Sequence, residues 1–411
     1  MRKLKNMAAA LAAVGLIGGA TLVRPSRADV AKPAATWKTA VEPKSLSGNV
    51  KRGLSWLAKH QLDNGAWGQG DEAAAMAGGT MAGASSVADT SMALLAFLRS
   101  GQTAKGGEYA ANVRRGIDYV VGEIERSDEG SLYVTQTRGT RVQSKIGTYV
   151  DTFTALMVLT EAKGTMGDDA ANARVAKALG KVIAKIEKNQ QQNGTWANQG
   201  WAPALTQSIA SKGLNRAAQS GEKVGDQTIA RVEKQAKDGF DGRGFATGGT
   251  AGVDLYGAAA TTSAVRDSAN TRVHEEKDVR EKLAKAKSEV ERRQYQARLD
   301  EGQKTRAAAE GAERALIKRT EDPAFIRGFG NNGGEEFLSY MLMSEALVVK
   351  GGAEWKKWDG AITSLVNGVQ NQDGSWTGHH CITGRTFCTA AALLVLMADR
   401  APVPMAGKLR G

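Results

Sequence analysis

A pattern of Gln, three residues, Gly, one residue and Trp occurs three times in this chain of 411 residues, which contains only eight Trp. Each copy follows a stretch with the apolar spacing of an amphipathic helix, so the pattern marks the loop after a helix. A unit that recurs along a chain cannot usually bury its apolar face alone and must stack on its neighbours. The repeated loop residues are Gln61, Gly65 and Trp67; Gln190, Gly194 and Trp196; and Gln370, Gly374 and Trp376.

Two kinds of helix alternate around these loops. The first kind is amphipathic, as where Val50, Leu54 and Leu57 recur at helical spacing between Lys and Arg. The second kind is apolar nearly all round, as in residues 87–101, and should be buried on every side. Together with weaker copies, the sequence contains about six such pairs. Six pairs bury their apolar helices best by closing on themselves, so we predict an all-α fold, an α/α toroid of about six inner and six outer helices over residues 48–400.

A strongly charged stretch at about residues 270–320 lies between the fourth pair and the last apolar segments. A heptad spacing holds for only two turns, at Val279, Leu283, Ala286 and Val290. The stretch is therefore expected to form an inserted, solvated projection, either one long helix or a helical hairpin that turns near Gly302. A partner-binding coiled coil is the alternative. Because it is too polar to be needed by the core, the stretch at 272–318 is the expected contact for a protein or envelope partner.

The first 28 residues have the features of a secretory signal peptide. A basic start is followed by a short uncharged apolar run, and small residues precede a cleavage point after Ala28. An uncleaved membrane anchor is the alternative, but the run is short for a membrane span. We therefore expect an exported protein of the periplasm or cell envelope, with no membrane span after cleavage. Residues 29–47 are expected to be an extended N-terminal segment and residues 401–411 a flexible tail.

The positive charge of the chain does not by itself indicate a nucleic-acid partner. The formal net charge is +12, but residues 1–28 hold five basic residues and no acid, which leaves +7 on the cleaved chain. The remaining Lys and Arg are spread over helix faces and are not gathered with aromatic residues. We expect no nucleic-acid partner, whereas attraction to an anionic envelope polymer or membrane surface remains open.

The segments RGLSWLAKHQLDNGAW and AITSLVNGVQNQDGSW, with the helices after them, resemble the QW repeats of squalene and terpenoid cyclases and the related prenyltransferase repeats. The resemblance covers roughly residues 48–264 and 324–400. It implies the α/α toroid, and it implies that the Trp and Gln of each loop are structural links between neighbouring repeats. The alternative is that the Trp residues form an aromatic cage for a ligand.

The catalytic motifs of the proteins that share this fold are missing from the sequence. There is no D-x-D-D acid, no D-D-x-x-D, no Asp-x-Cys zinc pattern and no C-G-E-Q. We therefore assign no catalytic residue and expect no cofactor. The first hypothesis is a non-catalytic scaffold or a binder of an apolar ligand in the central cavity. The alternatives are a terpenoid cyclase-like or transferase-like enzyme with a cryptic acid, and a carbohydrate-active enzyme.

Acidic residues begin most of the apolar helices. Helix capping explains carboxylates at these positions, because the first backbone N–H groups of a helix have no partner within it. A sharper interpretation is that they converge at the mouth of the ring, where two carboxylates can act as acid and base on a polysaccharide. These possible rim acids are Asp89, Asp151, Asp254, Glu335 and Glu336.

The only two Cys, Cys381 and Cys388, lie in the segment GHHCITGRTFCTA. Two cysteines seven residues apart in an exported protein most often form a disulfide, which is the prediction here. Two buried free thiols are one alternative. A zinc site that uses both Cys and one or both of His379 and His380 is the other, because these ligand types suit zinc although their spacing matches no common zinc finger.

Overall fold

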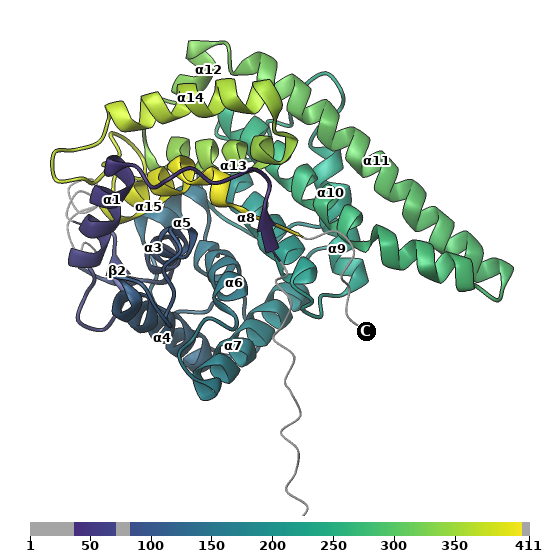
Figure 1. The fold of residues 1–411 in the computed structure, drawn as a ribbon, viewed down its shortest axis with the longest axis horizontal. Helices are drawn as coiled ribbons and strands as arrows, with labels where there is room; N and C mark the ends of the chain where they lie inside the picture. Colours follow the sequence, from purple (N-terminus) through teal and green to yellow (C-terminus); the bar gives the residue numbers. More distant parts are fainter. Residues whose placement is uncertain (1–36, 71–82, 405–411) are drawn as a thin grey trace, which may run out of the picture. The chain divides into compact units, whose positions relative to one another are not determined.

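The computed structural model describes residues 37–70 and 83–404, and these residues are mostly helical, which confirms the all-α prediction (Figure 1). The predicted signal peptide, residues 1–28, lies outside the described residues. Two short pairs of strands accompany the helices. Strand β1 (Trp37–Thr39) pairs antiparallel with β4 (Pro402–Pro404), and β2 (Trp67–Gly68) pairs antiparallel with β3 (Ser85–Ser86).

Six helices, which we call the core helices, contact one another in succession, and the last of them contacts the first. Most residues of these helices are buried, as expected for the apolar segments of the sequence, except in the second half of the helix at residues 254–285, which is mostly exposed or half-buried. In α6, for example, Glu161 is the one residue that is not fully buried. The core helices are α3 (Val87–Arg99), α6 (Val150–Ala162), α8 (Pro203–Gln219), α10 (Asp254–Lys285), α13 (Gly334–Lys350) and α15 (Arg385–Leu396).

A second set of helices, the flanking helices, packs against the core helices. These helices are amphipathic and bury a single stripe, which in α4 consists of Val113, Ile117, Val120, Val121 and Ile124 with two Gly. The flanking helices are α1 (Gly48–Lys59), α4 (Ala110–Arg126), α7 (Asp169–Lys188), α9 (Asp226–Asp238), α11 (Glu289–Arg319) and α14 (Gly352–Gly368). Three short elements complete the described helices: α5 (Arg141–Ile146), α12 (Pro323–Arg327) and the 3₁₀ turn η1 (Ala398–Arg400).

The Trp of each repeated loop is buried and bonded to the helix before it. The indole Nε1 atoms of Trp67, Trp196 and Trp376 each donate a hydrogen bond of 2.8 Å to a backbone carbonyl. The carbonyls belong to Leu57, Ile186 and Val366, which lie in the last turns of α1, α7 and α14, where helix carbonyls lack partners within the helix. Because the rings are at most 3% exposed, they cannot form the aromatic cage considered from the sequence.

The Gln of each loop bonds the next flanking helix. Gln61 Nε2 donates to the carbonyl of Gly65 in its own loop (2.8 Å) and to that of Asn112 in α4 (2.9 Å). Gln370 Nε2 makes the same two bonds to Gly374 and to Asn49 in α1, so the last loop is joined to the first helix, 321 residues earlier. Each loop Gly has a positive φ and touches that helix closely, as a Cβ on Gly65 would lie 2.5 Å from the Arg115 carbonyl oxygen.

The charged stretch forms the end of α10 and the whole of α11, which lie side by side (Figure 1). The chain turns at residues 286–288, where Ser288 and Glu291 form a capping box, and not near Gly302 as the sequence suggested. Gly302 is buried within α11 against Arg272. The second half of α11 buries Leu316 and two Ala. This half is therefore part of the core, although its polar sequence suggested that the core does not need it.

The first residues of the segment 401–411, which the sequence predicted to be a flexible tail, form a strand. Pro402–Pro404 form β4, which pairs with residues 37–39 of the segment predicted to be extended. Val403 is 8% exposed, and the carboxylate of Asp399 accepts a 2.7 Å bond from the Lys44 backbone N–H. The burial of one apolar residue and these backbone bonds account for the pairing. Among the described residues, no helix combines the length and apolar character needed to cross a bilayer.

Candidate functional site

Two glycine-rich loops lie against each other at the beginnings of α13 and α15. The Gly334 N–H donates to the Ile382 carbonyl (2.9 Å), and the His379 N–H donates to the Asn332 carbonyl (3.2 Å). A Cβ on Gly333 would lie 2.7 Å from Cε1 of His380, so glycine at this position permits the close approach. The loops thus bring residues about 45 positions apart in the sequence into one site.

Three side chains of different chemistry meet between these loops, and we call them the metal-site triad: Glu335, His380 and Cys381. Their candidate ligand atoms all lie within 4.8 Å of one another. Glu335 Oε1 and His380 Nδ1 are both buried without a hydrogen-bond partner, whereas Glu335 Oε2 accepts a 3.1 Å bond from the Ile382 N–H. Buried polar atoms without hydrogen-bond partners are costly, so two of them within this group of possible ligands make it a candidate cation site.

Glu336 holds the imidazole of His380 in place. His380 Nε2 lies 3.0 Å from Glu336 Oε2 and 2.5 Å from the Asn331 carbonyl oxygen. The other oxygen of Glu336 accepts bonds from the Tyr256 hydroxyl (2.6 Å) and the Phe329 N–H (3.0 Å). With a proton on Nε2, the Nδ1 atom is left as the free acceptor of the ring. A carboxylate behind a histidine is the usual outer support of a metal-binding imidazole.

The protonation of the triad reflects crowded anions in a buried place. Burial raises the pKa of Glu335 to about 7, and the neighbouring carboxylate of Glu336 adds to the rise. Burial, and then the charge of Glu335, raise the pKa of the Cys381 thiol to about 11. Burial lowers the pKa of His380, but the bond to Glu336 and its charge outweigh that effect and raise it. A divalent cation would reverse the pKa shifts of Glu335 and Cys381 by stabilising the carboxylate and the thiolate.

Positive side chains of α5 lie beside the triad. Arg141 Nε donates a 2.7 Å bond to the Cys381 carbonyl, and the charges of Lys145 and Arg141 favour the thiolate of Cys381. Lys145 Nζ lies 5.5 Å from the ring centre of Trp201, which also contacts Phe329. The side chain of His380 is 15% exposed and Phe329 is 56% exposed, so the site has access to solvent.

The two cysteines are free thiols in the structure, which does not contain the predicted disulfide. Cys381 and Cys388 lie in different surroundings. Cys388 is buried in α15, where its Sγ donates to the Ile382 carbonyl (3.5 Å) and burial raises its pKa well above the usual value. Cys381 belongs to the loop and faces Glu335 and His380. Of the four residues considered for zinc, the structure groups His380 and Cys381 and adds Glu335, whereas the side chain of His379 is exposed.

Four of the five possible rim acids, Asp89, Asp151, Glu335 and Glu336, begin core helices and are buried, and we call them the acidic cluster. Burial raises the pKa of the Asp89 carboxyl to about 7, a hydrogen bond with the Ser86 side chain acts in the opposite direction, and the charge of Asp151 adds to the rise. The oxygens of Asp151 accept bonds from the Ala88 N–H (2.9 Å) and Gln143 Nε2 (2.7 Å).

The buried position of Asp89 and Asp151 does not fit the carbohydrate hypothesis. Asp89 is 0% exposed and Asp151 is 3% exposed, so these carboxylates cannot contact a polysaccharide chain as acid and base. Asp254, the fifth acid, lies apart on the surface and pairs with Arg319 at 2.8 Å. Burial raises the pKa of Cys388, and the charges of Glu335 and Asp89 raise it further, which shows that α15 lies between the two halves of the acidic cluster.

A second buried group, which we call the ion network, lies at later turns of the core helices and was missed by the sequence analysis. Glu345 accepts bonds from Arg99 (2.8 Å) and Arg216 (2.6 Å) and lies 3.2 Å from Lys212 Nζ. These three cations hold the pKa of Glu345 well below its usual value despite burial, which acts in the opposite direction. The network consists of Arg99, Lys212, Arg216, Glu161, Asp267 and Glu345.

No protein-family model matches this chain, and no curated protein is significantly similar to it.

Proposed function

We propose that the chain is an exported α/α toroid that binds one zinc ion through the metal-site triad at the mouth of the ring and presents it to an anionic ligand. The observation that supports this function best is the pair of buried atoms without hydrogen-bond partners, Glu335 Oε1 and His380 Nδ1, in the group that also contains the Cys381 thiol. Export follows from the signal-peptide features of residues 1–28.

The toroid is supported by the cyclic order of helix contacts. Each core helix contacts the next, from α3 to α15, and α15 contacts α3. The bond between Gln370 and the Asn49 carbonyl joins the last repeat to the first, as a closed ring requires. In this arrangement α10 and α11 extend beyond the ring as the inserted helical projection, and the flanking helices form the outer layer.

Zinc is the metal that fits the donor set best. The triad offers one carboxylate oxygen, one imidazole nitrogen and one sulfur, and four-coordinate zinc accepts all three types. Three protein ligands leave a fourth position, and zinc bound there would polarise a water molecule or hold an anionic group. The hydrogen bonds of Glu336 would then keep the imidazole in the required tautomer.

We infer that the ligand is anionic because positively charged side chains lie beside the metal-site triad. Lys145 and Arg141 place two positive charges beside Cys381, next to the solvent-exposed Phe329. An apolar ligand that fills the centre of the ring is less well supported. The ion network occupies the space between five of the core helices at their later turns, where it would place six charged side chains against such a ligand.

Metal analysis of the purified protein tests this proposal. We expect about one zinc per chain, lost on chelation. The variants Glu335→Gln, His380→Ala and Cys381→Ser should each bind zinc at least about tenfold more weakly, as expected when a metal ligand or its support is removed. His379→Ala is the matched control, because it removes the adjacent but exposed imidazole and should retain the metal. Stoichiometric zinc that remains in all three triad variants would contradict the proposed site.

The N-terminus of the native protein tests export separately. Mass spectrometry of the protein from the cell envelope fraction should find Asp29 or a near neighbour as the first residue. An intact Met1 in that fraction would contradict cleavage without affecting the metal proposal.

A further inference from the structure

The fourth loop of the chain differs from the three that carry Trp. Asp241 Oδ1 accepts bonds from the N–H groups of Arg243 (2.8 Å) and Gly244 (2.9 Å), and Gly242 has a φ of +87°. The first repeated loop has a related turn, in which Asn64 Oδ1 accepts a bond from the Ala66 N–H (3.1 Å). Gly65, with its positive φ, lies between these two residues, and Trp67 follows them. The same offset that leads from Asn64 to Trp67 leads from Asp241 to Gly244, so the fourth loop has a glycine where the others have the Trp.

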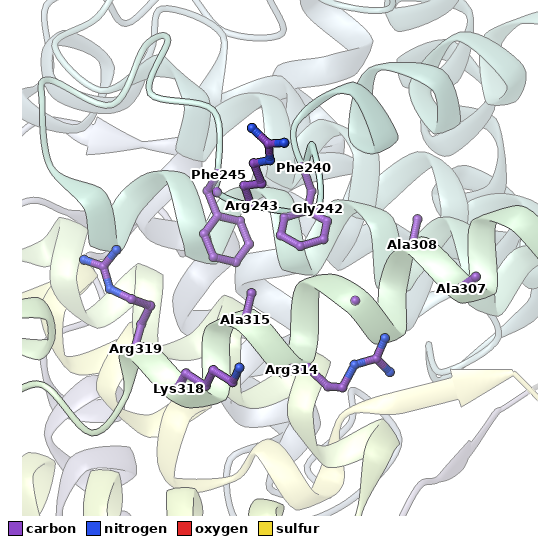
Figure 2. Close-up of a pocket in the computed structure, with 12 residues that line it drawn as sticks. Phe240, Gly242, Arg243, Phe245, Ala307, Ala308, Arg314, Ala315, Lys318 and Arg319 are labelled. Carbon is purple, nitrogen blue, oxygen red and sulfur yellow. The ribbon is translucent and has the colours of Figure 1, made fainter.

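A groove of about 710 Å³ lies between this loop and α11 (Figure 2). The rings of Phe240 and Phe245, whose centres are 5.3 Å apart, form one wall, and small residues of α11 form the other. A Cβ on Gly311 would lie 3.1 Å from Phe240, much as one on Gly116 would lie 2.9 Å from Trp67. Phe240 thus contacts α11 much as Trp67 contacts α4, and the groove lies beside this contact, where the loop has Gly244 in place of Trp.

Basic side chains surround this apolar groove. Arg314, Lys318 and Arg319 are spread along α11, and Arg243 lies on the loop (Figure 2). Arg319 pairs with Asp254, and Arg314 has only a 3.9 Å contact with Glu310 in which both side chains are 62% exposed. Within the described residues neither Arg243 nor Lys318 forms an ion pair, although the charge of Arg243, after the backbone N–H bonds of Gly244 and Arg243, contributes to the lowered pKa of Asp241. The border of the groove is thus positive and partly uncompensated.

We propose that this groove, called the α11 groove, binds an acidic segment of a partner protein that inserts one large apolar side chain between the two Phe rings and α11. Carboxylates on either side of that residue would pair with Arg243 and Lys318. A peptide fits better than a membrane surface because the Phe rings are half-buried within a recess and do not project from the molecule. The inference does not depend on the metal site, which is built from other loops.

The test uses the full-length protein and a fluorescein-labelled peptide of sequence Glu-Asp-Trp-Glu-Asp, with binding measured by fluorescence anisotropy. We expect saturable binding that weakens as salt increases. A peptide with Gly in place of Trp and one with Lys in place of the acids should both bind at least about tenfold more weakly, because each lacks one half of the recognition. Equal binding of all three peptides would overturn the proposal.

Two variants separate the groove from the rest of the surface. Gly244→Trp should fill the groove and abolish peptide binding while the protein stays folded, since no atom lies within 4 Å of the Cβ position. The double charge reversal of Arg243 and Lys318 to Glu should weaken binding about tenfold without filling the groove. Arg293→Glu, at an exposed position of α11 outside the groove, is the control and should bind normally.

Two results would overturn the proposal. One is peptide binding that neither variant changes. The other is preferential binding of phosphatidylglycerol vesicles that Gly244→Trp and the charge reversal abolish, because the groove would then recognise an anionic membrane and not a protein segment.

Discussion

The two ends of the core helices contain buried ionisable groups that differ in how they are paired. At the later turns, the ion network contains three cations and three anions, and each of them has a partner of opposite charge within 3.2 Å. At the beginnings, the acidic cluster contains four carboxyl groups, and burial raises the pKa of two of them, Asp89 and Glu335, to about 7. In the first arrangement every charge has an opposite partner, whereas in the second neither Asp89 nor Glu335 forms an ion pair with the described part of the chain.

This difference separates a structural role from a binding role. A buried ion pair that is fully satisfied can fix the packing of the helices that supply it, even when its net contribution to stability is small. A buried carboxylate without a partner costs free energy, so its presence in an otherwise well-packed fold indicates a function at that place. The acidic cluster also lies next to a nitrogen donor and a sulfur donor, those of His380 and Cys381.

The largest expected effect is the loss of the central anion of the ion network. Glu345→Gln should lower the free energy of unfolding by about 3–5 kcal/mol, because Arg99, Arg216 and Lys212 would remain buried with one partner fewer. Glu335→Gln is the matched change at the other end. In the metal-free protein at pH 8 it should not destabilise the fold, since it removes a buried charge that lacks a cation. Urea unfolding measures the free energy of unfolding of both variants. Equal losses in the two variants would contradict the difference between the ion network and the acidic cluster.

Zinc should supply the cation that the acidic end lacks. At a free zinc concentration 100 to 1,000 times the dissociation constant, the free energy of unfolding should rise by about 3–4 kcal/mol. The rise should disappear in Cys381→Ser and persist in Cys388→Ser, whose thiol bonds the Ile382 carbonyl instead. Thermal unfolding with and without zinc measures the effect. A rise that depends on Cys388 and not on Cys381 would place the metal elsewhere.

Asp89 should make the stability of the protein depend on pH in a definite direction. Its folded pKa is raised from 3.8 to about 7, so the folded state holds the proton more tightly and loses stability as pH rises through about 7. Asp89→Asn should remove this loss and stabilise the protein at pH 8 by about 2–4 kcal/mol, with little effect near pH 4. Unfolding measured from pH 4 to pH 8 tests the slope, and a variant as pH-dependent as the native protein would contradict the assignment.

The smallest effect is expected for the acid that lies outside the cluster. Asp254→Asn breaks only the exposed pair with Arg319, whose side chains are 58% and 44% exposed. It should change the free energy of unfolding by less than about 1 kcal/mol at any pH between 5 and 8. A change as large as that of Asp89→Asn would mean that position at the start of a core helix, and not burial, determines the behaviour of these acids.

The repeated loops allowed the all-α class and the two kinds of helix to be predicted from the sequence, because each loop has its own signal. Helical periodicity gave the two kinds of helix, and the Gln, Gly and Trp positions marked where they join. The sequence contains a further signal of the contacts between repeats. The segments NVKRG at 49–53 and NVRRG at 112–116 begin the helices that the loops bond, and they supply the Asn carbonyls that Gln370 and Gln61 contact.

The candidate site was only half visible because its residues come from two distant loops. His380 and Cys381 were recognised together, but the third donor is Glu335 of α13, which the sequence placed among helix caps. Spacing alone suggested the pairing of Cys381 with Cys388, which the geometry of the loop does not make. The ion network did have a signal: Arg99, Glu161 and Glu345 are isolated charges near the ends of otherwise apolar helices.

X-ray absorption at the zinc edge of the purified, zinc-loaded protein tests the central claim most directly. The account predicts one sulfur in the first shell at about 2.3 Å, with nitrogen and oxygen ligands at about 2.0–2.2 Å, and the loss of the sulfur signal in Cys381→Ser. A first shell without sulfur, or with two sulfur atoms from Cys381 and Cys388, would contradict the metal-site triad.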